Sequence, residues 1–571
     1  VTDCCFEMFY FNIGVLGHVD SGKTTLSRCL STTASTAAFD KNPQSQERGI
    51  TLDLGFSCFE VDAPPALQSE ASRVQITLVD CPGHASLIRT IIAGAHIIDA
   101  MMLVVDVTKG IQTQTAECLV IGEILCNHLL VVLNKVDLLP ADKSKAMIDK
   151  MTKRLRIALQ STKFANAKII AIAAKPGGGE EMSNIASNPV GITELISALQ
   201  EILYVPKRQK SGPFVFSVDH CFGIRGQGTV MTGTVLQGSI AINDALEIPL
   251  LGITKKVKSM QMFRKPVEKA VQGDRLGVCV TQFDPKLLER GIACTPGLIK
   301  NAVALLVCVE KIPYYKQSIE TKAKFHMSIG NETVMSKVTF FGTTDSPQLD
   351  GCIDLGKEYK YQDELIDVKK QITDNCNSYK PTQQFALVQL ERCVPVLPSS
   401  FVIGSKLDMD VHTNMCRLAF KGTTLEIYTA KDYAESQLPT LKIYKNKSKE
   451  GVVERMLNES EVIVKNLLKK DTNLQLFVGL KVKLSTGETG TIDSHFGSSG
   501  KLKVRVAAGL SKATIERMLA QAAGKKKGKN SAAAAADSMQ NLSLDKKPTE
   551  SITVKLDFKK YVFANDKKMV Q

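Results

Sequence analysis

The sequence predicts an α/β domain with a doubly wound, mostly parallel sheet, followed by two antiparallel β-barrels and a mostly β C-terminal domain. Three observations support this. Apolar runs of strand length alternate with helix-length stretches as far as residue 203, which is typical of parallel sheets covered on both faces. After residue 213, short strands of alternating polarity are separated by glycines, as in antiparallel barrels. The C-terminal region contains three more short strand patterns, which are split by glycine-containing turns.

The first domain is expected to span residues 1–208. Its apolar runs predict buried strands at 11–16, 74–80, 100–107, 129–137 and 167–175. The segment 191–203 is expected to be its closing helix. The proline- and glycine-bounded segment 205–213 is expected to be a linker.

The two barrels are expected at residues 212–300 and 301–464, and the C-terminal domain at 465–571. Within that last domain, residues 476–506 contain three short strand patterns split by G-E-T-G and G-S-S-G turns. The stretch 522–548 has low complexity and predicts a disordered insertion. A strand at 551–563 should then pair back into the terminal barrel.

The composition is that of an ordinary globular protein, with 44% hydrophobic residues among 571. No uncharged apolar run reaches 18 residues, so no membrane-spanning helix is expected, and no signal pattern precedes Gly17. The fifteen cysteines are scattered and form no C-x-x-C pair. Reduced cytosolic thiols are therefore expected rather than disulfides or a zinc site.

The positive charge is concentrated near the C-terminus. The net charge is +14, and residues 465–571 hold 21 lysine or arginine residues against 9 aspartate or glutamate residues. This excess indicates a polyanionic partner, most simply RNA. The alternative is a set of solvated lysines without a specific partner. The lysine cluster at 524–529 is also a candidate nuclear localisation signal.

The segment GHVDSGKT, residues 17–24, matches the phosphate-binding P-loop pattern between a strand and a helix. Its backbone N–H groups and the helix N-terminus suit phosphate oxygens. Lys23 supplies a cation for the β- and γ-phosphates, and the Thr24 hydroxyl can ligate Mg²⁺. Asp20 adds a carboxylate near the phosphates.

Three later motifs follow predicted strands. In DCPGH, Asp80 can hold Mg²⁺ and the Gly83 N–H can meet a γ-phosphate. In NKVD, Asp137 can accept hydrogen bonds from guanine N1 and N2, supported by Asn134 and Lys135. The segment AAK can contact guanine O6. Together these motifs predict a GTPase that binds GTP or GDP through Gly17, His18, Val19, Asp20, Ser21, Gly22, Lys23, Thr24, Thr25, Asp80, Gly83, Asn134, Lys135, Asp137, Ala173, Ala174 and Lys175.

Hydrolysis is expected to depend on three residues. Thr51, in QERGIT, is the natural second hydroxyl on Mg²⁺ when the γ-phosphate orders its loop. His84 is the candidate for orienting the attacking water. Lys23 is the third. The predicted magnesium ligands are therefore Thr24, Thr51 and Asp80.

The motifs GHVDSGKTTL, RGIT, DCPGH and NKVD, followed by two barrels, resemble those of the translational GTPases of the elongation factor Tu / 1A group. Within that group, RGITLDLGFSCF (48–59), ECLVIGEILCNHLLVVLNKVDLLP (117–140), LFVGLKVKLSTGETGTID (476–493) and the terminal FKKYVF most resemble the eukaryotic, SelB-like selenocysteine-specific elongation factors. The alanine run at 532–536 departs from the family and leaves the role of that linker open.

The resemblance implies a translation elongation factor. Such a protein would bind GTP and selenocysteinyl-tRNA(Sec) and deliver the tRNA to the ribosomal A site at recoded UGA codons, with GTP hydrolysis. The basic C-terminal domain would engage the selenocysteine insertion element RNA and its binding protein. A cytoplasmic monomer is expected, with a nuclear location open.

The resemblance also implies an amino-acid pocket between the first domain and the first barrel. Ordinary factors have Glu-Asp where this chain has Asp219 and His220, and Arg275 lies at the position of the family's pocket arginine. A selenol is much more acidic than a thiol, so selenocysteine is largely an anion at neutral pH, whereas cysteine and serine are not. From the sequence alone, Asp219 and His220 could instead be a hydrogen-bonded pair at a strand end.

Four alternatives share the GTPase motifs. A general aminoacyl-tRNA carrier would have an acidic pair at 219–220 and no basic C-terminal domain. An initiator-tRNA GTPase often has a cysteine knuckle, and a rescue or termination GTPase usually has a long N-terminal extension. A regulatory GTPase of the sulfate-activation type would not bind RNA, which the basic terminal domain argues against.

Overall fold

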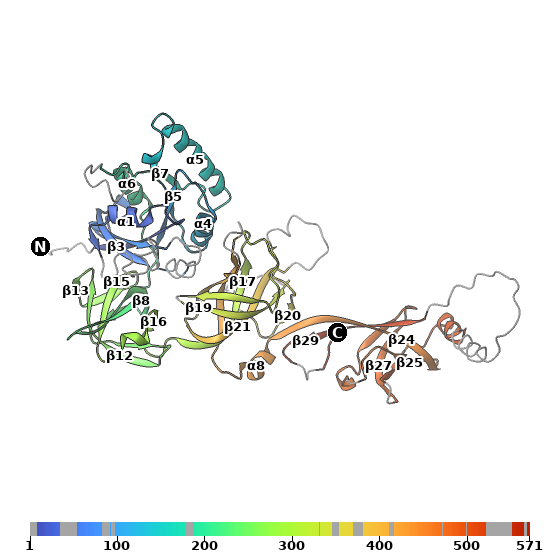
Figure 1. Ribbon diagram of the computed structural model, residues 1–571. Coiled ribbons are helices and arrows are strands. Elements are labelled where there is room, and N and C mark those ends of the chain that lie inside the picture. The colour runs from blue at the N-terminus through green and yellow to red at the C-terminus, as the bar shows by residue number, and fades with distance from the viewer. Residues whose placement is uncertain are drawn as a thin grey trace, which may run out of the picture. The chain divides into compact units, whose positions relative to one another are not determined.

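The computed structural model (Figure 1) forms two compact units. The first contains Val1–Phe340, Ser346–Gly351 and Asp363–Ala430, and the second contains Phe341–Asp345, Cys352–Gln362 and Lys431–Gln571. No helix in the described part of the chain is long and apolar enough to cross a membrane. The described residues are 8–34, 54–82, 92, 97–176, 188–330, 332–344, 353–368, 381–409, 416–470, 472–497, 500–520, 551–564 and 568–571.

The N-terminal domain contains a seven-stranded sheet in the order β2-β3-β4-β1-β5-β6-β7. Strands β4, β1, β5, β6 and β7 are parallel, and β3 is antiparallel to β4. The five predicted strands are confirmed, whereas β2 and β3 were not anticipated. The strands are β1 (Phe9–Gly17), β2 (Thr33–Ala34), β3 (Gly55–Asp62), β4 (Arg73–Asp80), β5 (Ala100–Asp106), β6 (Leu129–Asn134) and β7 (Lys168–Ala171).

Helices cover both faces of this sheet (Figure 1). Strand β5 shows why its sequence is apolar throughout: Met101, Leu103 and Val105 pack in one core cluster, and the alternating Met102 and Val104 in another. The predicted closing helix is confirmed as α6. The helices are α1 (Lys23–Leu30), η1 (Pro65–Leu67), α4 (Thr113–Leu125), η3 (Val136–Leu138), α5 (Ser144–Leu159) and α6 (Ile192–Ile202).

The first barrel is closed by six antiparallel strands in the order β11-β16-β8-β9-β15-β12, with β12 pairing back to β11. Its strands are β8 (Val215–Ile224), β9 (Gly228–Gln237), β11 (Ala245–Ile248), β12 (Ile253–Met262), β15 (Arg275–Val280) and β16 (Gly291–Cys294). The smaller elements are β10 (Ser239–Ala241), β13 (Lys265–Val267), β14 (Lys269–Val271) and η4 (Pro285–Leu287).

The second barrel is also closed by six antiparallel strands, in the order β18-β22-β23-β17-β21-β19, with β19 pairing back to β18. Both predicted barrels are therefore confirmed. The strands are β17 (Lys300–Lys311), β18 (Lys324–Ile329), β19 (Glu332–Thr343), β21 (Gln383–Val396), β22 (Phe401–Ser405) and β23 (Leu418–Tyr428).

Two ion pairs attach the linker and the second barrel to the N-terminal domain. Arg208, in the linker, pairs with Asp99 at 2.7 Å. Arg417 of the second barrel makes a bidentate pair with Glu117 of α4, at 2.8 and 2.7 Å. The Arg417–Glu117 pair is buried, and breaking such a pair costs about 3–5 kcal/mol, so this contact holds the second barrel against the N-terminal domain.

The C-terminal unit is built on a third set of six strands, closed by the pairing of β24 with β29. The predicted last strand is confirmed as β29, which pairs with β24 and β26. Strands β24 and β25 belong to this unit, although they precede the expected domain limit at 465. The six strands are β24 (Lys442–Asn458), β25 (Glu461–Lys465), β26 (Lys481–Leu484), β27 (Thr489–Phe496), β28 (Lys501–Arg505) and β29 (Thr553–Tyr561). A further strand, β20 (Glu358–Tyr361), pairs in parallel with β24. The helices of the unit are α8 (Tyr433–Ser436), η5 (Leu438–Thr440), η6 (Leu474–Leu476) and residues 512–520.

Candidate nucleotide and amino-acid sites

The predicted phosphate loop connects β1 to α1. Gly22 has φ +89°, and a Cβ there would collide with the Asn134 side-chain amide. The turn therefore requires glycine, both for its left-handed backbone and for its close approach to β6. Helix α1 starts at Lys23, and Gly22 of the loop is its N-cap.

The interior of the phosphate loop suits an anion. Lys23 is buried, and its ammonium donates to the His18 carbonyl at 2.7 Å. Burial lowers the pKa of Lys23, against the opposing effect of the Asp80 carboxylate. The Ser21 hydroxyl is buried and has no hydrogen-bond partner within the described residues. A phosphate group would supply the missing negative charge and acceptors, so the loop fits the phosphates of GTP.

The loop also has the oxygen donors that a magnesium ion needs. The Thr24 hydroxyl donates to a carboxylate oxygen of Asp80 at 2.6 Å, so the helix α1 and the end of β4 meet there. Hydroxyl and carboxylate oxygens are hard ligands of the kind that Mg²⁺ prefers. These two side chains fit the predicted ion.

The predicted guanine-binding residues gather at the ends of β6 and β7. Asn134 donates from Nδ2 to the Ser21 carbonyl at 3.0 Å, while its Oδ1 accepts from the N–H groups of Lys135 and Ala174 at 2.9 and 3.2 Å. The Ala173 N–H donates to Val190 O at 3.1 Å. The N–H groups of Ala173 and Ala174 are therefore both used inside the protein. Asp137, in η3, is exposed.

Arg275 is the first residue of strand β15, and the turn before it is held by contacts with the N-terminal domain. The preceding turn is held by Asn12, whose amide donates to the Gly273 carbonyl at 3.0 Å. Gly273 has φ +93°, and a Cβ there would collide with the Arg208 guanidinium. The linker arginine and β1 thus set the position from which Arg275 projects.

The Arg275 guanidinium is buried, with the whole residue only 5% exposed. Its Nη1 donates to Asp219 Oδ2 at 2.5 Å and to Thr234 Oγ1 at 3.3 Å. Its Cζ lies 3.0 Å from the centroid of the Phe56 ring in β3. Burial lowers the pKa of Arg275, opposed by the charge of Asp219. Nε and Nη2 have no hydrogen-bond partner in the described part of the chain, so this cation is only partly satisfied.

Asp219 reaches Arg275 because β8 is irregular at that residue. The register of β8 against β9 shifts between Val218 and His220, and such a bulge changes the direction in which a side chain points. Asp219 is buried, whereas the neighbouring His220 is half-buried and lies opposite Thr232. Arg275 and Asp219 are therefore brought together as expected, and His220 lies beside them along the strand.

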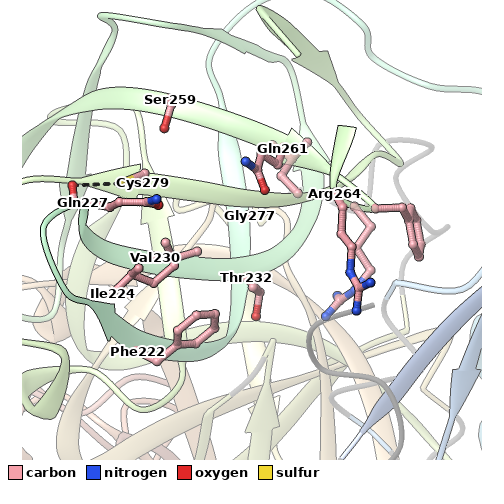
Figure 2. Close-up of a pocket in the computed structure, with 13 residues that line it drawn as sticks. Phe222, Ile224, Gln227, Val230, Thr232, Ser259, Gln261, Arg264, Gly277 and Cys279 are labelled. Atoms are coloured by element: carbon pink, nitrogen blue, oxygen red, sulfur yellow. Dashed lines mark hydrogen bonds between the residues drawn. The ribbon is translucent and has the colours of Figure 1, made fainter. Parts of the chain in front are cut away.

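A cavity of about 100 Å³ lies against Arg275 in the first barrel. Figure 2 shows Arg264, Gln261 and Thr232 around it, with the apolar side chains of Ile224 and Phe222 lower in the view. Thr232 Oγ1 is buried without a hydrogen-bond partner among the described residues. The cavity thus combines an apolar wall with unused polar groups beside a buried cation, as expected of a small-ligand site.

A search for similar proteins gives a relative over nearly the whole chain. A protein of Mus musculus described as a selenocysteine-specific elongation factor is 54% identical over 579 aligned residues, which cover 98% of both chains. This chain belongs to the selenocysteine-specific elongation factors. It is a GTP-binding translation factor of that family, so the general-carrier, initiator, rescue-or-termination and sulfate-activation alternatives are all wrong.

Family patterns assign the parts of this elongation factor. The pattern of the elongation factor Tu GTP binding domain matches residues 9–206, so the N-terminal domain is a GTPase domain that hydrolyses GTP. The pattern of the selenocysteine-specific elongation factor, eukaryotes, 3rd domain, matches 306–422. The eEFSec C-terminal RIFT domain matches 439–567.

Other relatives share less of the sequence, and one solved structure has the same fold. A selenocysteine-specific elongation factor of Methanocaldococcus jannaschii is 38% identical over 58% of this chain and 66% of its own. The crystal structure of elongation factor SelB from Methanococcus maripaludis with the GTP analogue GppNHp superposes with a TM-score of 0.63 at 24% identity, covering 97% of this chain and 99% of that one.

Three predicted residues of this factor lie outside the described residues: Thr51, Gly83 and His84. Others were not anticipated. Gln114 of α4 accepts from the Val19 N–H at 3.3 Å, and Asp106 pairs with Lys135 at 3.0 Å. Asp106 ends an apolar strand just as Asp80 does, a signal that could have identified it. Phe56 had no such signal.

Proposed function

We propose that this factor binds selenocysteinyl-tRNA(Sec) in its GTP form and delivers it to the ribosomal A site at recoded UGA codons. The observation that carries the proposal is the Arg275 guanidinium, which is buried beside a cavity. Its Nε and Nη2 have no hydrogen-bond partner among the residues that the structure describes. A buried cation in this state favours a ligand that brings negative charge and acceptors. The selenolate of selenocysteine is such a ligand.

The same geometry supports rejection of serine. A neutral hydroxyl would give Arg275 an acceptor but no charge, and it would still displace water from the cavity. The buried cation would then depend on Asp219 alone, whose carboxylate reaches only Nη1. Discrimination by leaving a buried group poorly paired is stronger than discrimination by size. His220 could donate a further hydrogen bond to the selenium.

For GTP, we assign Lys23, Ser21 and the backbone of Gly17–Thr24 to the phosphates, and Thr24 and Asp80 to Mg²⁺. When bound, Mg²⁺ would neutralise charge on the β- and γ-phosphate oxygens. Asp137 is the candidate reader of guanine N1 and N2. Because Ala173 and Ala174 already donate within the protein, the guanine O6 contact falls to Lys175 among these three residues.

The hydrolysis step is assigned from the sequence motifs. Thr51 would be the second hydroxyl on Mg²⁺, Gly83 would contact the γ-phosphate, and His84 would orient the attacking water. Ribosome contact would stimulate the reaction. The expected compartment is the cytoplasm, where translation takes place, and the lysines at 524–529 leave a nuclear location as part of the proposal.

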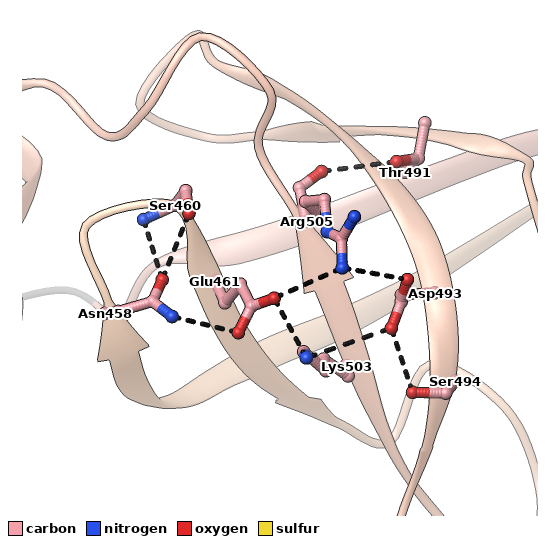
Figure 3. Close-up of polar contacts among 8 residues, drawn as sticks. All are labelled: Asn458, Ser460, Glu461, Thr491, Asp493, Ser494, Lys503 and Arg505. Atoms are coloured by element: carbon pink, nitrogen blue, oxygen red, sulfur yellow. Dashed lines mark hydrogen bonds and ion pairs between the residues drawn. The ribbon is translucent and has the colours of Figure 1, made fainter.

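The C-terminal unit is proposed to bind RNA, including the selenocysteine insertion element, and the protein that binds it. Not all of its cations are free to do so. Figure 3 shows Lys503 and Arg505 held by the carboxylates of Glu461 and Asp493. Lys559 pairs with Glu358 at 2.6 Å. These cations are neutralised within the unit.

A second group of lysines supports the RNA proposal. Lys449, Lys465, Lys469 and Lys470 line an open cavity of about 630 Å³ and have no ion pair with any described residue. Burial lowers the pKa of Lys449, and the neighbouring charges of Lys469 and Lys560 lower it further. Like charges held together in this way are stabilised by a polyanion such as an RNA backbone. We call this group the lysine cavity.

The cargo proposal is tested by titrating the protein with selenocysteinyl-tRNA and seryl-tRNA in the presence of a GTP analogue. The unchanged protein should prefer selenocysteinyl-tRNA. Arg275→Ala should remove most of this preference while leaving the affinity for the GTP analogue unchanged, because Arg275 lies in the barrel rather than in the phosphate loop. If Arg275→Ala keeps the preference, the pocket is assigned wrongly.

A further inference from the structure

Strand β1 contains a buried polar residue, Asn12, among apolar neighbours. Side chains alternate between the two faces of a strand. On one face, Phe11 and Ile13 pack in a core cluster of the GTPase domain, whereas Tyr10, on the face of Asn12, packs against the core of the first barrel. Asn12 is 3% exposed. Burying an amide is costly unless it is hydrogen-bonded, so the contacts of Asn12 indicate why an amide is used here.

Asn12 holds the turn from which Arg275 projects. Its Nδ2 donates to the Gly273 carbonyl at 3.0 Å. The turn begins at Val271, whose carbonyl accepts from the Asp274 N–H at 3.1 Å. Gly273 is its third residue and has φ +93°, the positive value that a type II turn requires at this position. The GTPase domain thus fixes a carbonyl that lies two residues before Arg275.

Arg208, in the linker, lies against the same turn. Its Nη2 pairs with Asp99 Oδ2 at 2.7 Å, and its Cζ lies 5.7 Å from the centroid of the Phe9 ring. A Cβ on Gly273 would lie only 2.2 Å from the Arg208 Cζ. The same Asp99 Oδ2 accepts from the backbone N–H of Asn12 at 2.8 Å. One carboxylate oxygen therefore connects the two residues that contact the turn.

The barrel holds the turn from its other side. The Gly273 N–H donates to the Val235 carbonyl at 2.9 Å, and the Val235 N–H donates to the Asp274 carbonyl at 2.9 Å. Arg275 then lies opposite Thr234 in the ladder of β15 and β9. Because Arg275 is the next residue, a shift of the turn would move its guanidinium. Binding sites need their groups held to within about 0.5 Å, so the turn contacts bear on what the pocket selects.

We propose that Asn12 and Arg208 are positioning residues that hold the turn before Arg275 and thereby set the preference for selenocysteine over serine. The proposal rests on the function proposed above, because it assigns the residues that place the cation of the same pocket. Neither side chain would contact the cargo. They act by keeping the unused edge of the Arg275 guanidinium directed at the position of the selenolate.

The test measures the ratio of affinities for selenocysteinyl-tRNA and seryl-tRNA in the presence of a GTP analogue. Asn12→Ala removes the hydrogen bond to the turn, and Gly273→Ala places a methyl group where Arg208 lies. Gly252→Ala is the matched control, because Gly252 also has a positive φ, +64°, but a Cβ there meets no atom within 4 Å. Arg417→Met controls for the loss of an ion pair that joins the other barrel to the GTPase domain.

Asn12→Ala should reduce the preference for selenocysteinyl-tRNA by about 2- to 12-fold, the range for one ordinary hydrogen bond. Gly273→Ala should reduce it at least as much. Gly252→Ala and Arg417→Met should lower the unfolding temperature but leave the preference unchanged. Adding Asn12→Ala to Arg275→Ala should change the preference no further, because the residue that Asn12 positions is then absent.

Three results would overturn the positioning role and leave the cargo pocket intact. One is full preference in Asn12→Ala when Arg275→Ala has lost it. Another is a further loss when Asn12→Ala is added to Arg275→Ala, which would mean that Asn12 acts by a separate route. The third is an equal loss in Gly273→Ala and Gly252→Ala, which would assign the loss to turn strain rather than to Arg208. Full preference in Arg275→Ala would instead overturn the pocket itself, so the failures of the two proposals can be told apart.

Discussion

The pocket at Arg275 and the lysine cavity are both candidate anion sites, yet they are built in opposite ways. Arg275 is a single buried cation with an internal carboxylate partner and an aromatic ring on one face. The lysine cavity is open and gathers four lysines that have no ion pair with a described residue, although Glu450 and the Glu454-paired Lys501 also line it. A buried, oriented cation selects one ligand, whereas exposed lysines give affinity that depends on salt and little on identity. The comparison suggests that one site determines which cargo binds and the other how strongly RNA is held.

The largest effect is expected from breaking the buried pair of the first site. Asp219→Asn would leave the Arg275 guanidinium buried without its counterion, at a cost of about 3–5 kcal/mol. Calorimetric unfolding should show this loss, and hydrogen exchange should locate it in the first barrel. The double change Asp219→Leu with Arg275→Met should recover stability without recovering cargo preference.

The control for this experiment is Glu268→Gln, since Glu268 is an exposed acid of the same barrel. Its unfolding should match that of the unchanged protein. Equal stability of Asp219→Asn and Glu268→Gln would mean that the pair is not an isolated buried charge, and the contrast between the two sites would disappear.

The lysine cavity should respond to salt, and the Arg275 pocket should not. In Lys469→Ala with Lys470→Ala, the slope of log affinity for RNA against log salt should fall by about 1.4–1.8, since each phosphate contact contributes about 0.7–0.9. Fluorescence titrations of an RNA oligonucleotide at several salt concentrations measure this slope. The preference between the two charged tRNAs should stay constant over the same range.

Lys483→Ala with Lys512→Ala is the matched control, because these lysines are exposed in the same unit but do not line the cavity. A slope reduced equally by both pairs would show that RNA binds the general charge of the unit. In that case the cavity would have no special part in binding.

The smallest effect is expected in the pH dependence of the lysine cavity. The pKa of Lys449 lies below its usual 10.5 because of burial and neighbouring lysines, and a bound polyanion would raise it again. RNA binding therefore takes up a proton, and affinity should fall as the pH rises through the lowered pKa. Lys449→Arg, which stays charged, should flatten the profile measured at constant ionic strength.

The same shift has a consequence for stability with the opposite sign. Between the lowered pKa and 10.5, the unfolded chain binds more protons at Lys449 than the folded unit does. The free C-terminal unit should therefore become more stable as the pH rises through that window. The result that would contradict the lowered pKa of Lys449 is a loss of stability as the pH rises through this window in the unchanged unit but not in Lys449→Arg.

The sequence predicted those features that are encoded locally. Buried strands such as 100–107 were recognisable because the first six residues of β5 alternate between two cores, and the phosphate loop was recognisable because its glycine spacing is dictated by its turns. Family resemblance added Asp219 and Arg275, which the structure joins at 2.5 Å. The roles given to Thr51, Gly83 and His84 stay predictions.

Features that depend on tertiary contact could not be predicted. Phe56 belongs to an edge region whose strand pairing, antiparallel to β4, breaks the parallel pattern used to find the others. Its contact with Arg275 joins two domains, and no local pattern encodes such a pair. The lysine cavity was visible only as an excess of charge, because sequence does not distinguish Lys469 from the internally paired Lys503.

The irregular step in β8 has a consequence for how such factors diverge. Beyond it, regular pairing resumes with Cys221 opposite Met231 and Phe222 opposite Val230, so the rest of the strand is not disturbed by the residue that turns toward Arg275. The part of the barrel proposed to recognise the amino acid is thereby separated from the part that maintains its shape. Exchanges at one or two positions could alter the cargo of such a barrel without requiring a new fold.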